Sequence, residues 1–259
     1  MVPPATRLVV VAPHPDDETI AAGGLIQRVV ETGGQVHVVF VTNGDGYPEA
    51  ASALTGDSTP SHSDFRVLGA RRLQEAAQAT RTLGVSEGHL TFLGFPDGEL
   101  AVLRGRCWSR WTPCASPYTG VGPFSGERLV AALERALADA QPTIVVAPDP
   151  RDVHPDHSAA GHFALAAART LRPAPMVLTY VIHDPAWPPA LRERPDLPPP
   201  GGPRYAQDSW WSLALTPHEI ATKREALSKY RTQLAVLEDL LDRFVRSNEM
   251  FSRVATSGG

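Results

Sequence analysis

The chain has 259 residues, of which 42% are hydrophobic and 20% charged, and its formal net charge is −4. This composition provides enough apolar side chains for a sizeable core, and the absence of a long Lys or Arg run argues against a nucleic-acid or anionic-membrane partner. No segment approaches the ~20 apolar residues of a membrane span and the N-terminus does not resemble a signal peptide, so we expect a cytoplasmic protein without a membrane span.

Short apolar runs rich in β-branched residues alternate with amphipathic segments along most of the chain. Such runs are typical of strands buried on both faces of a sheet, and apolar residues spaced three and four apart indicate helices. In chain order we predict a strand at 8–12, a helix at 19–31, a strand at 36–42, a helix at 66–83, a strand at 90–93, a helix at 129–140, a strand at 143–147, a helix at 158–171 and a strand at 176–182. Repeated βαβ units predict an α/β, Rossmann-like three-layer fold with a mostly parallel sheet.

Three long segments rich in Gly, Pro and Ser interrupt this pattern and are predicted to be loops: 43–64, 100–126 and 184–202. Loops of this length inside a compact domain are usually functional. A short strand at 211–215 and a helical tail from 217 to about 245 are predicted to follow. We therefore interpret 1–259 as a single domain, with a core at 5–183 and a loop and helical C-terminal extension at 184–259.

The two cysteines of the chain are Cys107 and Cys114. A disulfide between them is one interpretation, but in a cytoplasmic protein we expect two free thiols. Two thiolates alone do not complete a tetrahedral site, so we do not expect this pair to bind a metal.

A histidine and three acidic residues follow the first predicted strand, in the run His14-Pro-Asp16-Asp17-Glu18. In a parallel sheet this loop lies at the carboxyl end of a strand, where open α/β folds bind their ligands. A dinucleotide-binding protein would have a glycine-rich turn here, whereas acidic groups repel phosphate and attract a cation. The structural alternative is that Asp16 or Asp17 caps the next helix and Glu18 complements its dipole.

A second motif of the same kind follows the fourth predicted strand, where Asp149-Pro-Arg-Asp152-Val-His154-Pro-Asp156-His157 precedes a helix. Two histidines three residues apart, with a carboxylate between them, suit zinc ligation supported by a neighbouring acid. If the first and fourth strands are neighbours, the two loops face each other across one crevice. Each loop alone could be a capped helix start, but the two together favour a metal site.

The two motifs resemble the signatures of the PIG-L/LmbE-type N-acetylglucosamine deacetylases. Supporting matches are Arg72-Leu-Gln-Glu75, the run Leu-Gly-Phe-Pro-Asp-Gly at 93–98, and the tail from Lys223 to Gln233. The resemblance runs in order along most of the chain, and the two His-Asp motifs are its specific part. It implies a hydrolase that removes the N-acetyl group from an N-acetylglucosamine-containing substrate by means of a metal-activated water.

Carried over by position, the resemblance implies a zinc site formed by His14, Asp17 and His157. It makes Asp16 the general base and His154 the group that faces the oxyanion. Asp156 would favour a protonated His154 if its carboxylate hydrogen-bonds to that imidazole. Two imidazoles and one carboxylate leave the metal an open position for water, and this donor set suits Fe²⁺ as well as Zn²⁺.

Candidates for substrate contacts lie in other loops. Arg72 is the candidate for a sugar-hydroxyl contact, with Arg71 as the alternative. Asp97 stands in a Pro-Asp-Gly turn, where it is either a ligand for substrate or a turn former, and Asn43 follows the second predicted strand. Three aromatic residues are expected either to stack on sugar rings or to pack in the core: Trp108, Trp111 and Tyr118.

Two other functions fit the same residues. An amidase with this metal site could cleave a different amide, in a thiol- or glyco-conjugate. A metal-bound carbohydrate-binding protein could bind without turnover, but Asp16 argues against it because binding alone needs no base beside the metal. We therefore expect a small-molecule sugar or glycoconjugate as substrate, and no nucleic-acid partner.

Overall fold

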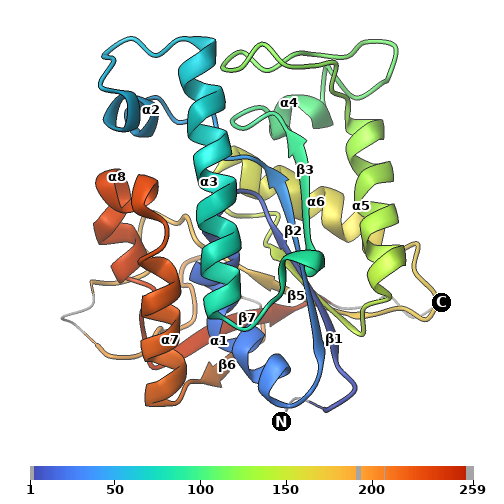
Figure 1. Ribbon diagram of the computed structural model, residues 1–259. Coiled ribbons are helices and arrows are strands. Elements are labelled where there is room, and N and C mark those ends of the chain that lie inside the picture. Colours follow the sequence, from blue (N-terminus) through green and yellow to red (C-terminus); the bar gives the residue numbers. More distant parts are fainter. Residues whose placement is uncertain (1–2, 191–193, 207, 255–259) are drawn as a thin grey trace.

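The computed structural model describes residues 3–190, 194–206 and 208–254. Within them the strands form one seven-stranded sheet in the order β3-β2-β1-β4-β5-β7-β6 (Figure 1). The strands are β1 (Arg7–Ala12), β2 (Gln35–Thr42), β3 (Leu90–Phe95), β4 (Ile144–Pro148), β5 (Met176–Tyr180), β6 (Trp210–Ala214) and β7 (Asn248–Arg253). The helices are α1 (Asp17–Glu31), α2 (Pro48–Thr55), α3 (His62–Thr82), α4 (Leu100–Arg104), α5 (Gly126–Ala140), α6 (Pro155–Ala168), α7 (Pro217–Leu227) and α8 (Arg231–Asp242).

The five strands from β1 to β5 are parallel. β1 lies at the centre, with Leu8 opposite Val36 of β2 and Val9 opposite Val145 of β4. The first and fourth strands are therefore neighbours, and their carboxyl ends bring the two histidine motifs to the same edge of the sheet. β7 runs antiparallel between β5 and β6. The predicted α/β fold with a mostly parallel sheet is confirmed.

Alternate residues of β1 point into two separate cores. Leu8 and Val10 belong to the core that includes side chains of α1, α3, α7 and α8, whereas Val9 and Val11 belong to the core under α4, α5 and α6. Figure 1 shows α3, α7 and α8 on one side of the sheet and α5 on the other. Because both faces are covered, these strands are continuous apolar runs and could be located in the sequence.

Two segments predicted as loops contain helices. The segment 43–64 contains α2, which begins at Pro48, a residue that favours the first helical turn, and ends before Gly56, whose φ of 78° is left-handed. α3 begins at His62 rather than at residue 66 because Ser61 and Asp64 form a capping box. The segment 100–126 begins with α4.

The C-terminal extension differs most from the prediction. The single helical tail is instead two helices, α7 and α8, followed by strand β7, which was not predicted. β7 was missed because it begins with two polar residues, Asn248 and Glu249, that are nonetheless buried. Asn248 exchanges hydrogen bonds with the backbone of Leu197, and Glu249 accepts hydrogen bonds from the backbone of α1, so both polar side chains are satisfied inside the protein.

Cys107 and Cys114 form a disulfide, so the expectation of two free thiols is wrong. After α4 the chain turns, and Cys114 pairs with Phe124 in an isolated β-bridge. This turn brings the two cysteine Cα atoms to 5.8 Å, which is within the usual range for a disulfide. Among the described residues, none of the helices has the length and apolar character needed to cross a membrane.

Candidate active site

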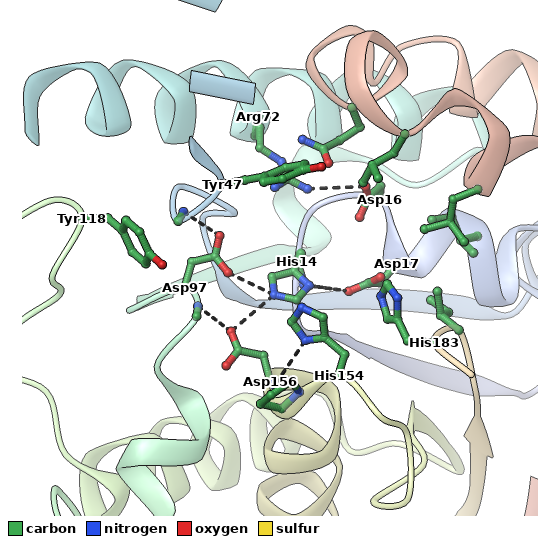
Figure 2. A pocket seen from close by; sticks show the side chains of 18 residues that line it. His14, Asp16, Asp17, Tyr47, Arg72, Asp97, Tyr118, His154, Asp156 and His183 are labelled. Carbon is green, nitrogen blue, oxygen red and sulfur yellow. Dashed lines mark hydrogen bonds and ion pairs between the residues drawn. The ribbon is translucent and has the colours of Figure 1, made fainter. Parts of the chain in front are cut away.

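A cavity of about 480 Å³ opens at the carboxyl edge of the parallel strands (Figure 2). Its walls come from the loops after all five parallel strands and from α8. This is where open α/β sheets bind ligands, because the neighbouring strand ends leave a crevice between their loops. The two histidine motifs and Asp97 lie together in this cavity.

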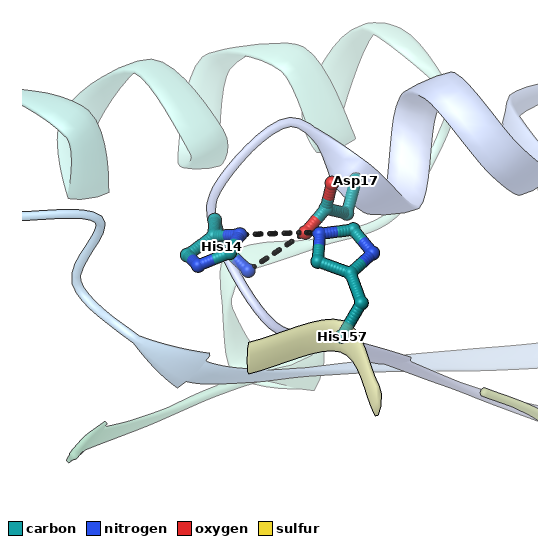
Figure 3. Close-up of side chains that lie close together, drawn as sticks. All are labelled: His14, Asp17 and His157. Atoms are coloured by element: carbon teal, nitrogen blue, oxygen red, sulfur yellow. Dashed lines mark hydrogen bonds and ion pairs between the residues drawn. The ribbon is translucent and has the colours of Figure 1, made fainter. Parts of the chain in front are cut away.

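His14, Asp17 and His157 form a group that could hold a metal ion. Their potential ligand atoms all lie within 4.8 Å of one another, and all three residues are buried. Oδ2 of Asp17 is 3.2 Å from Nδ1 of His14 and 3.2 Å from Nε2 of His157 (Figure 3). Two imidazoles and one carboxylate are a known donor set of catalytic zinc sites, which keep one position open.

The other ring nitrogen of His14 faces two further carboxylates. Nε2 lies 3.1 Å from Asp97 and 3.4 Å from Asp156. Both acids are already hydrogen-bonded: Asp97 accepts from the backbone of Gly46, and Asp156 accepts from Gly98 and Leu100. Although His14, Asp97 and Asp156 also lie close enough to hold an ion, this arrangement favours a proton on Nε2 and leaves the lone pair of Nδ1 for a metal shared with Asp17.

Asp152 faces the second ring nitrogen of His157 in the same way. Its Oδ2 is 3.5 Å from Nδ1 of His157 and accepts hydrogen bonds from the backbone of Ile182 and His183, while Oδ1 accepts from the backbone of His154. A carboxylate behind a ligating imidazole orients the ring and increases its basicity. The sequence analysis did not assign Asp152 a role, although its place in the second motif, two residues before His154, was a usable signal.

The donor atoms fit a bound cation. Nε2 of His157 is buried, and among the described residues it makes no hydrogen bond of acceptable geometry, although Asp17 is close by. Burial alone would raise the pKa of Asp17, but His157 and His14 hold it well below its usual range. Burial likewise opposes protonation of His157, yet Asp17 and Asp152 raise its pKa to about 9. The site therefore has an anionic centre that attracts a positive charge, either protons or a metal ion.

Asp16 lies beside this group but points its carboxylate elsewhere. Its φ of 125° is unusual for a residue with a side chain, and strain of this kind is concentrated at functional sites. Oδ2 of Asp16 is 3.4 Å from the guanidinium of Arg72 (Figure 2). Burial raises the pKa of Asp16 to about 8, and Arg72 opposes this rise. A carboxyl group with a pKa near neutrality is suited to exchange protons.

His154 is the N-cap of α6 and lines the cavity. Its Nδ1 accepts a hydrogen bond of 3.2 Å from the backbone N–H of Asp156, which places the ring proton on Nε2. Burial, together with His14 and His157, lowers the pKa of His154 to about 4, so the ring is neutral at pH 7. The Asp156 carboxylate contacts His14 instead, so the condition for a protonated His154 is not met.

Arg72 is held across two of the loops. It donates to the carbonyls of Gly44 at 2.8 Å and Pro15 at 2.6 Å, so it ties the loop after β2 to the loop after β1. Gly44 has a left-handed φ of 66°, and any side chain there would collide with the guanidinium. Arg71, the alternative in the sequence, pairs with Glu75 in a half-exposed position away from the cavity.

The other candidates for substrate contact lie in different parts of the structure. Asp97 and Tyr118 line the main cavity, whereas Asn43 lines a neighbouring cavity of about 250 Å³. Trp108 stacks on Phe163, and Trp111 is 84% exposed. The structure thus brings one of the three aromatic candidates into the main cavity.

The first motif is supported from the C-terminal extension. Helix α1 has a break at Ala22, where φ is −137°. Nζ of Lys223 donates to the carbonyl of Ile20 before the break, and Glu249 accepts from the N–H groups of Gly24 and Leu25 after it. Lys223 and Glu249 form a buried ion pair at 2.7 Å, so both ends of the interrupted helix are satisfied.

Several cavity residues were given no chemical role by the sequence analysis. His183 follows β5, and its ring centroid is 4.6 Å from that of His157. Four aliphatic residues and a buried amide also line the cavity: Ile20, Ile182, Leu237, Leu240 and Gln233. Aliphatic positions carry no sequence signal that separates a cavity wall from the core, so only the three-dimensional arrangement identifies them.

Comparisons with known proteins agree with this geometry. A deacetylase described as 1D-myo-inositol 2-acetamido-2-deoxy-alpha-D-glucopyranoside deacetylase, from Mycolicibacterium vanbaalenii, is 31% identical over 254 residues, which are 90% of this chain and 82% of that protein. A protein of the same description from Streptomyces griseus is 32% identical over 176 residues, but the match spans 64% of this chain and about half (49%) of that protein.

A solved structure, the N,N'-diacetylchitobiose deacetylase from Pyrococcus horikoshii, superposes with a TM-score of 0.62 at 21% identity, covering 96% of this chain and 84% of that one. At this identity the likeness shows a common fold. The PIG-L family, described as GlcNAc-PI de-N-acetylase, matches residues 9–168, a stretch that contains both histidine motifs and more than half of the chain. The chain therefore belongs to the PIG-L family of N-deacetylases.

Proposed function

We propose that this protein is a zinc-dependent hydrolase that removes the acetyl group from an N-acetylglucosamine-containing substrate. The observation that carries the proposal is the group of three buried donors, His14, Asp17 and His157, with a carboxylate, Asp16, beside it and free of it. The names of the curated relatives support the substrate class, because both act on a 2-acetamido-2-deoxyglucoside.

His14, Asp17 and His157 would hold the zinc ion. When bound, zinc polarises the amide carbonyl and lowers the pKa of a water molecule. Asp97 and Asp156 behind His14, and Asp152 behind His157, would keep both imidazoles in the ligating orientation. The same donors suit Fe²⁺, so the metal content of the purified protein has to be measured together with its activity.

Asp16 would accept a proton from the attacking water. Its carboxylate is buried, lies next to a proposed ligand in the sequence and is held by Arg72. Its pKa is about 8 before a cation binds, and a bound cation would lower this pKa, so that the ionised carboxylate could take the proton and pass it to the departing amine nitrogen. The C–N bond then breaks to give acetate and a free amine.

His154 would stabilise the negative charge that develops on the carbonyl oxygen. Its Nδ1 is engaged by the backbone of Asp156, so the neutral ring can donate only from Nε2. A fixed donor of this kind, aimed at a developing oxyanion, is worth about 10²–10³ in rate. Arg72, Asp97 and Tyr118, which line the cavity, would bind the sugar. Figure 2 shows Asp97 and Tyr118 on the side of His14 away from Asp17.

The test is amine release from a panel of N-acetyl sugars by purified protein of measured metal content. The panel should include free N-acetylglucosamine, N,N'-diacetylchitobiose and the inositol glycoside named for the curated relatives. We expect stoichiometric acetate and amine from at least one of them, loss of activity after chelation, and recovery with Zn²⁺ or Fe²⁺. Binding of these sugars without amine release by the metal-loaded protein would contradict the proposal and favour a binding protein.

A further inference from the structure

The cavity has two chemically different sides. Figure 2 shows Tyr118 and Asp97 on one side of His14, and Asp17 and His183 on the other. The side that contains Tyr118 and Asp97 carries charges and hydroxyl groups. The other side is continued by four aliphatic side chains: Ile20, Ile182, Leu237 and Leu240.

The four aliphatic residues belong to one apolar cluster. Ile20 and Ile182 are members of its core, and Leu237 and Leu240 pack against that core from α8. Ile20 is one turn after Asp17 in α1, and Ile182 directly precedes His183. The apolar side of the cavity therefore combines residues that neighbour Asp17 and His183 in the sequence with residues of α8.

Helix α8 is fixed in this position by the site itself. The hydroxyl of Tyr230, at the N-cap of α8, donates to Glu18 of the first motif at 2.5 Å. Thr232 donates to Glu75 of α3 at 2.6 Å. All four of these residues are buried. The wall formed by α8 is thus anchored to the catalytic loop on one side and to α3 on the other.

The aliphatic wall is larger than an acetyl group requires. Leu237 and Leu240 line the cavity from α8, and Ile20 and Ile182 line it from two other segments. Leu237 has a non-helical φ of −135°, which breaks the regular course of the helix at the cavity. An acetyl group presents a single methyl group, which can contact only a small part of this surface.

An N-acyl amino sugar has two chemically different parts on either side of its amide bond. The sugar carries hydroxyl groups, which match Arg72, Asp97 and Tyr118, whereas the acyl chain contains only carbon and hydrogen and matches an aliphatic wall. We propose that the aliphatic wall of Ile20, Ile182, Leu237 and Leu240 binds the acyl group, and that this enzyme hydrolyses N-acyl glucosamines with acyl chains longer than acetyl. This inference rests on the proposed function and extends it to a class of acyl group.

The reaction is the same hydrolysis with a different acid as product. Water adds to the acyl carbon, the C–N bond breaks, one proton goes to the amine nitrogen, and the products are a fatty carboxylate and the free amino sugar. No additional reactant is needed.

The test compares N-acetyl, N-butyryl and N-hexanoyl derivatives of the best sugar in the panel above. The amino sugar is the common product, so one assay serves all three. Burial of each methylene contributes at most about fourfold to kcat/KM. Because the wall is partly open, we expect kcat/KM to be about threefold higher for the N-butyryl sugar than for the N-acetyl sugar, and about tenfold higher for the N-hexanoyl sugar. A hexanoyl-to-acetyl ratio at or below one overturns the inference.

Variants of α8 locate the effect. Leu237→Ala combined with Leu240→Ala should lower the hexanoyl-to-acetyl ratio at least about threefold, since several buried contacts are removed. Leu234→Ala is the matched control, because Leu234 lies on the same helix but packs against the core and does not line this cavity. The ratio is measured within one sample, so it does not depend on the folded or metal-loaded fraction. An equal loss in the control overturns the assignment to the wall.

The outcomes separate this inference from the proposed function. Hydrolysis of the N-acetyl sugar alone leaves the proposed function in place and rejects the acyl wall. Hydrolysis of only the longer amides supports the wall and replaces a deacetylase by a deacylase. If none of the amides is hydrolysed, both proposals are wrong.

Discussion

The loops after β1 and β4 contain the same tripeptide, His-Pro-Asp, and the fold uses it in two different ways. In the first loop His14 faces Asp17 and His157 with Nδ1, and Asp16 has a strained φ of 125°. In the second loop His154 is an ordinary N-cap, and Asp156 accepts hydrogen bonds from the backbone of Gly98 and Leu100.

The two loops also differ in what holds them. The second loop is supported from within by the N-cap and by Pro155 in the first turn of α6, and from the loops after β3 and β5 by backbone hydrogen bonds to Asp156 and Asp152. The first loop depends on distant parts of the chain, namely Arg72 and the buried pair Lys223–Glu249. Identical residues therefore take different chemical roles because their tertiary partners differ. Four variants or conditions would break or sharpen this comparison.

The largest effect is expected at the aspartate of the first tripeptide. Asp16→Asn removes the proposed base but keeps the size and the hydrogen-bonding capacity with Arg72, and asparagine tolerates a positive φ. We expect kcat to fall by about 10²–10⁴, while metal content, measured by mass spectrometry, stays at the wild-type level. Wild-type kcat in this variant would remove Asp16 from the mechanism.

The support of the first loop is tested by Lys223→Met. Removal of Lys223 leaves Glu249 buried without its cation, and loss of one partner of a buried pair costs about 3–5 kcal/mol in the free energy of unfolding. Lys229→Met is the control, because Lys229, just after α7, forms a solvent-accessible pair with Glu225, and surface pairs contribute about 1 kcal/mol or less. Equal denaturant midpoints for the two variants would show that the buried pair does not support α1.

The carboxylates behind the two ligating imidazoles should have similar effects if the loops converge on one ion. Asp152→Asn and Asp156→Asn are each expected to weaken zinc affinity about 10–100-fold, measured by competition with a fluorescent chelator. If Asp152→Asn leaves zinc affinity unchanged, His157 is not a ligand and does not share a metal with His14. For His14 the same conclusion requires Asp97→Asn together with Asp156→Asn, because both carboxylates lie behind this ring.

The pH dependence of zinc binding tests the protonation of the two imidazoles. In the metal-free protein Asp97, Asp156 and Asp17 raise the pKa of His14 above its usual value against the opposing effect of burial, and the pKa of His157 is about 9. Zinc must displace these protons, so affinity should rise with pH up to about 9, by about tenfold per pH unit for each proton displaced. His154, with a pKa of about 4, should not contribute. A plateau above pH 7 in the chelator assay would contradict this prediction.

Much of the fold could be predicted because buried parallel strands have an unmistakable pattern. The runs at 8–12 and 36–42 correspond to β1 and β2 within one residue at their N-terminal ends. β7 could not be predicted in this way, because Asn248 and Glu249 are buried polar residues whose partners lie in distant segments. The disulfide between Cys107 and Cys114 was likewise decided by a turn that the composition of the loop does not specify.

The candidate site could likewise be predicted only in part. His14, Asp17 and His157 could be identified from two motifs at strand ends, because residue types and the positions of strands can both be read from short stretches of sequence. The orientation of Asp156 toward His14, the role of Asp152 and the aliphatic wall of α8 depend on side chains that meet only after folding.

The sequence by itself determined the α/β class and the residues that can bind a metal, because the hydrophobic periodicity and the types of ligating side chain can be read directly from it. The tertiary structure alone decided which nitrogen of each histidine faces the shared site, what supports the strained turn at Asp16, and which side of the cavity is apolar. These properties depend on contacts between residues far apart in the chain, such as Lys223 with Ile20 and Tyr230 with Glu18, and no local pattern encodes them.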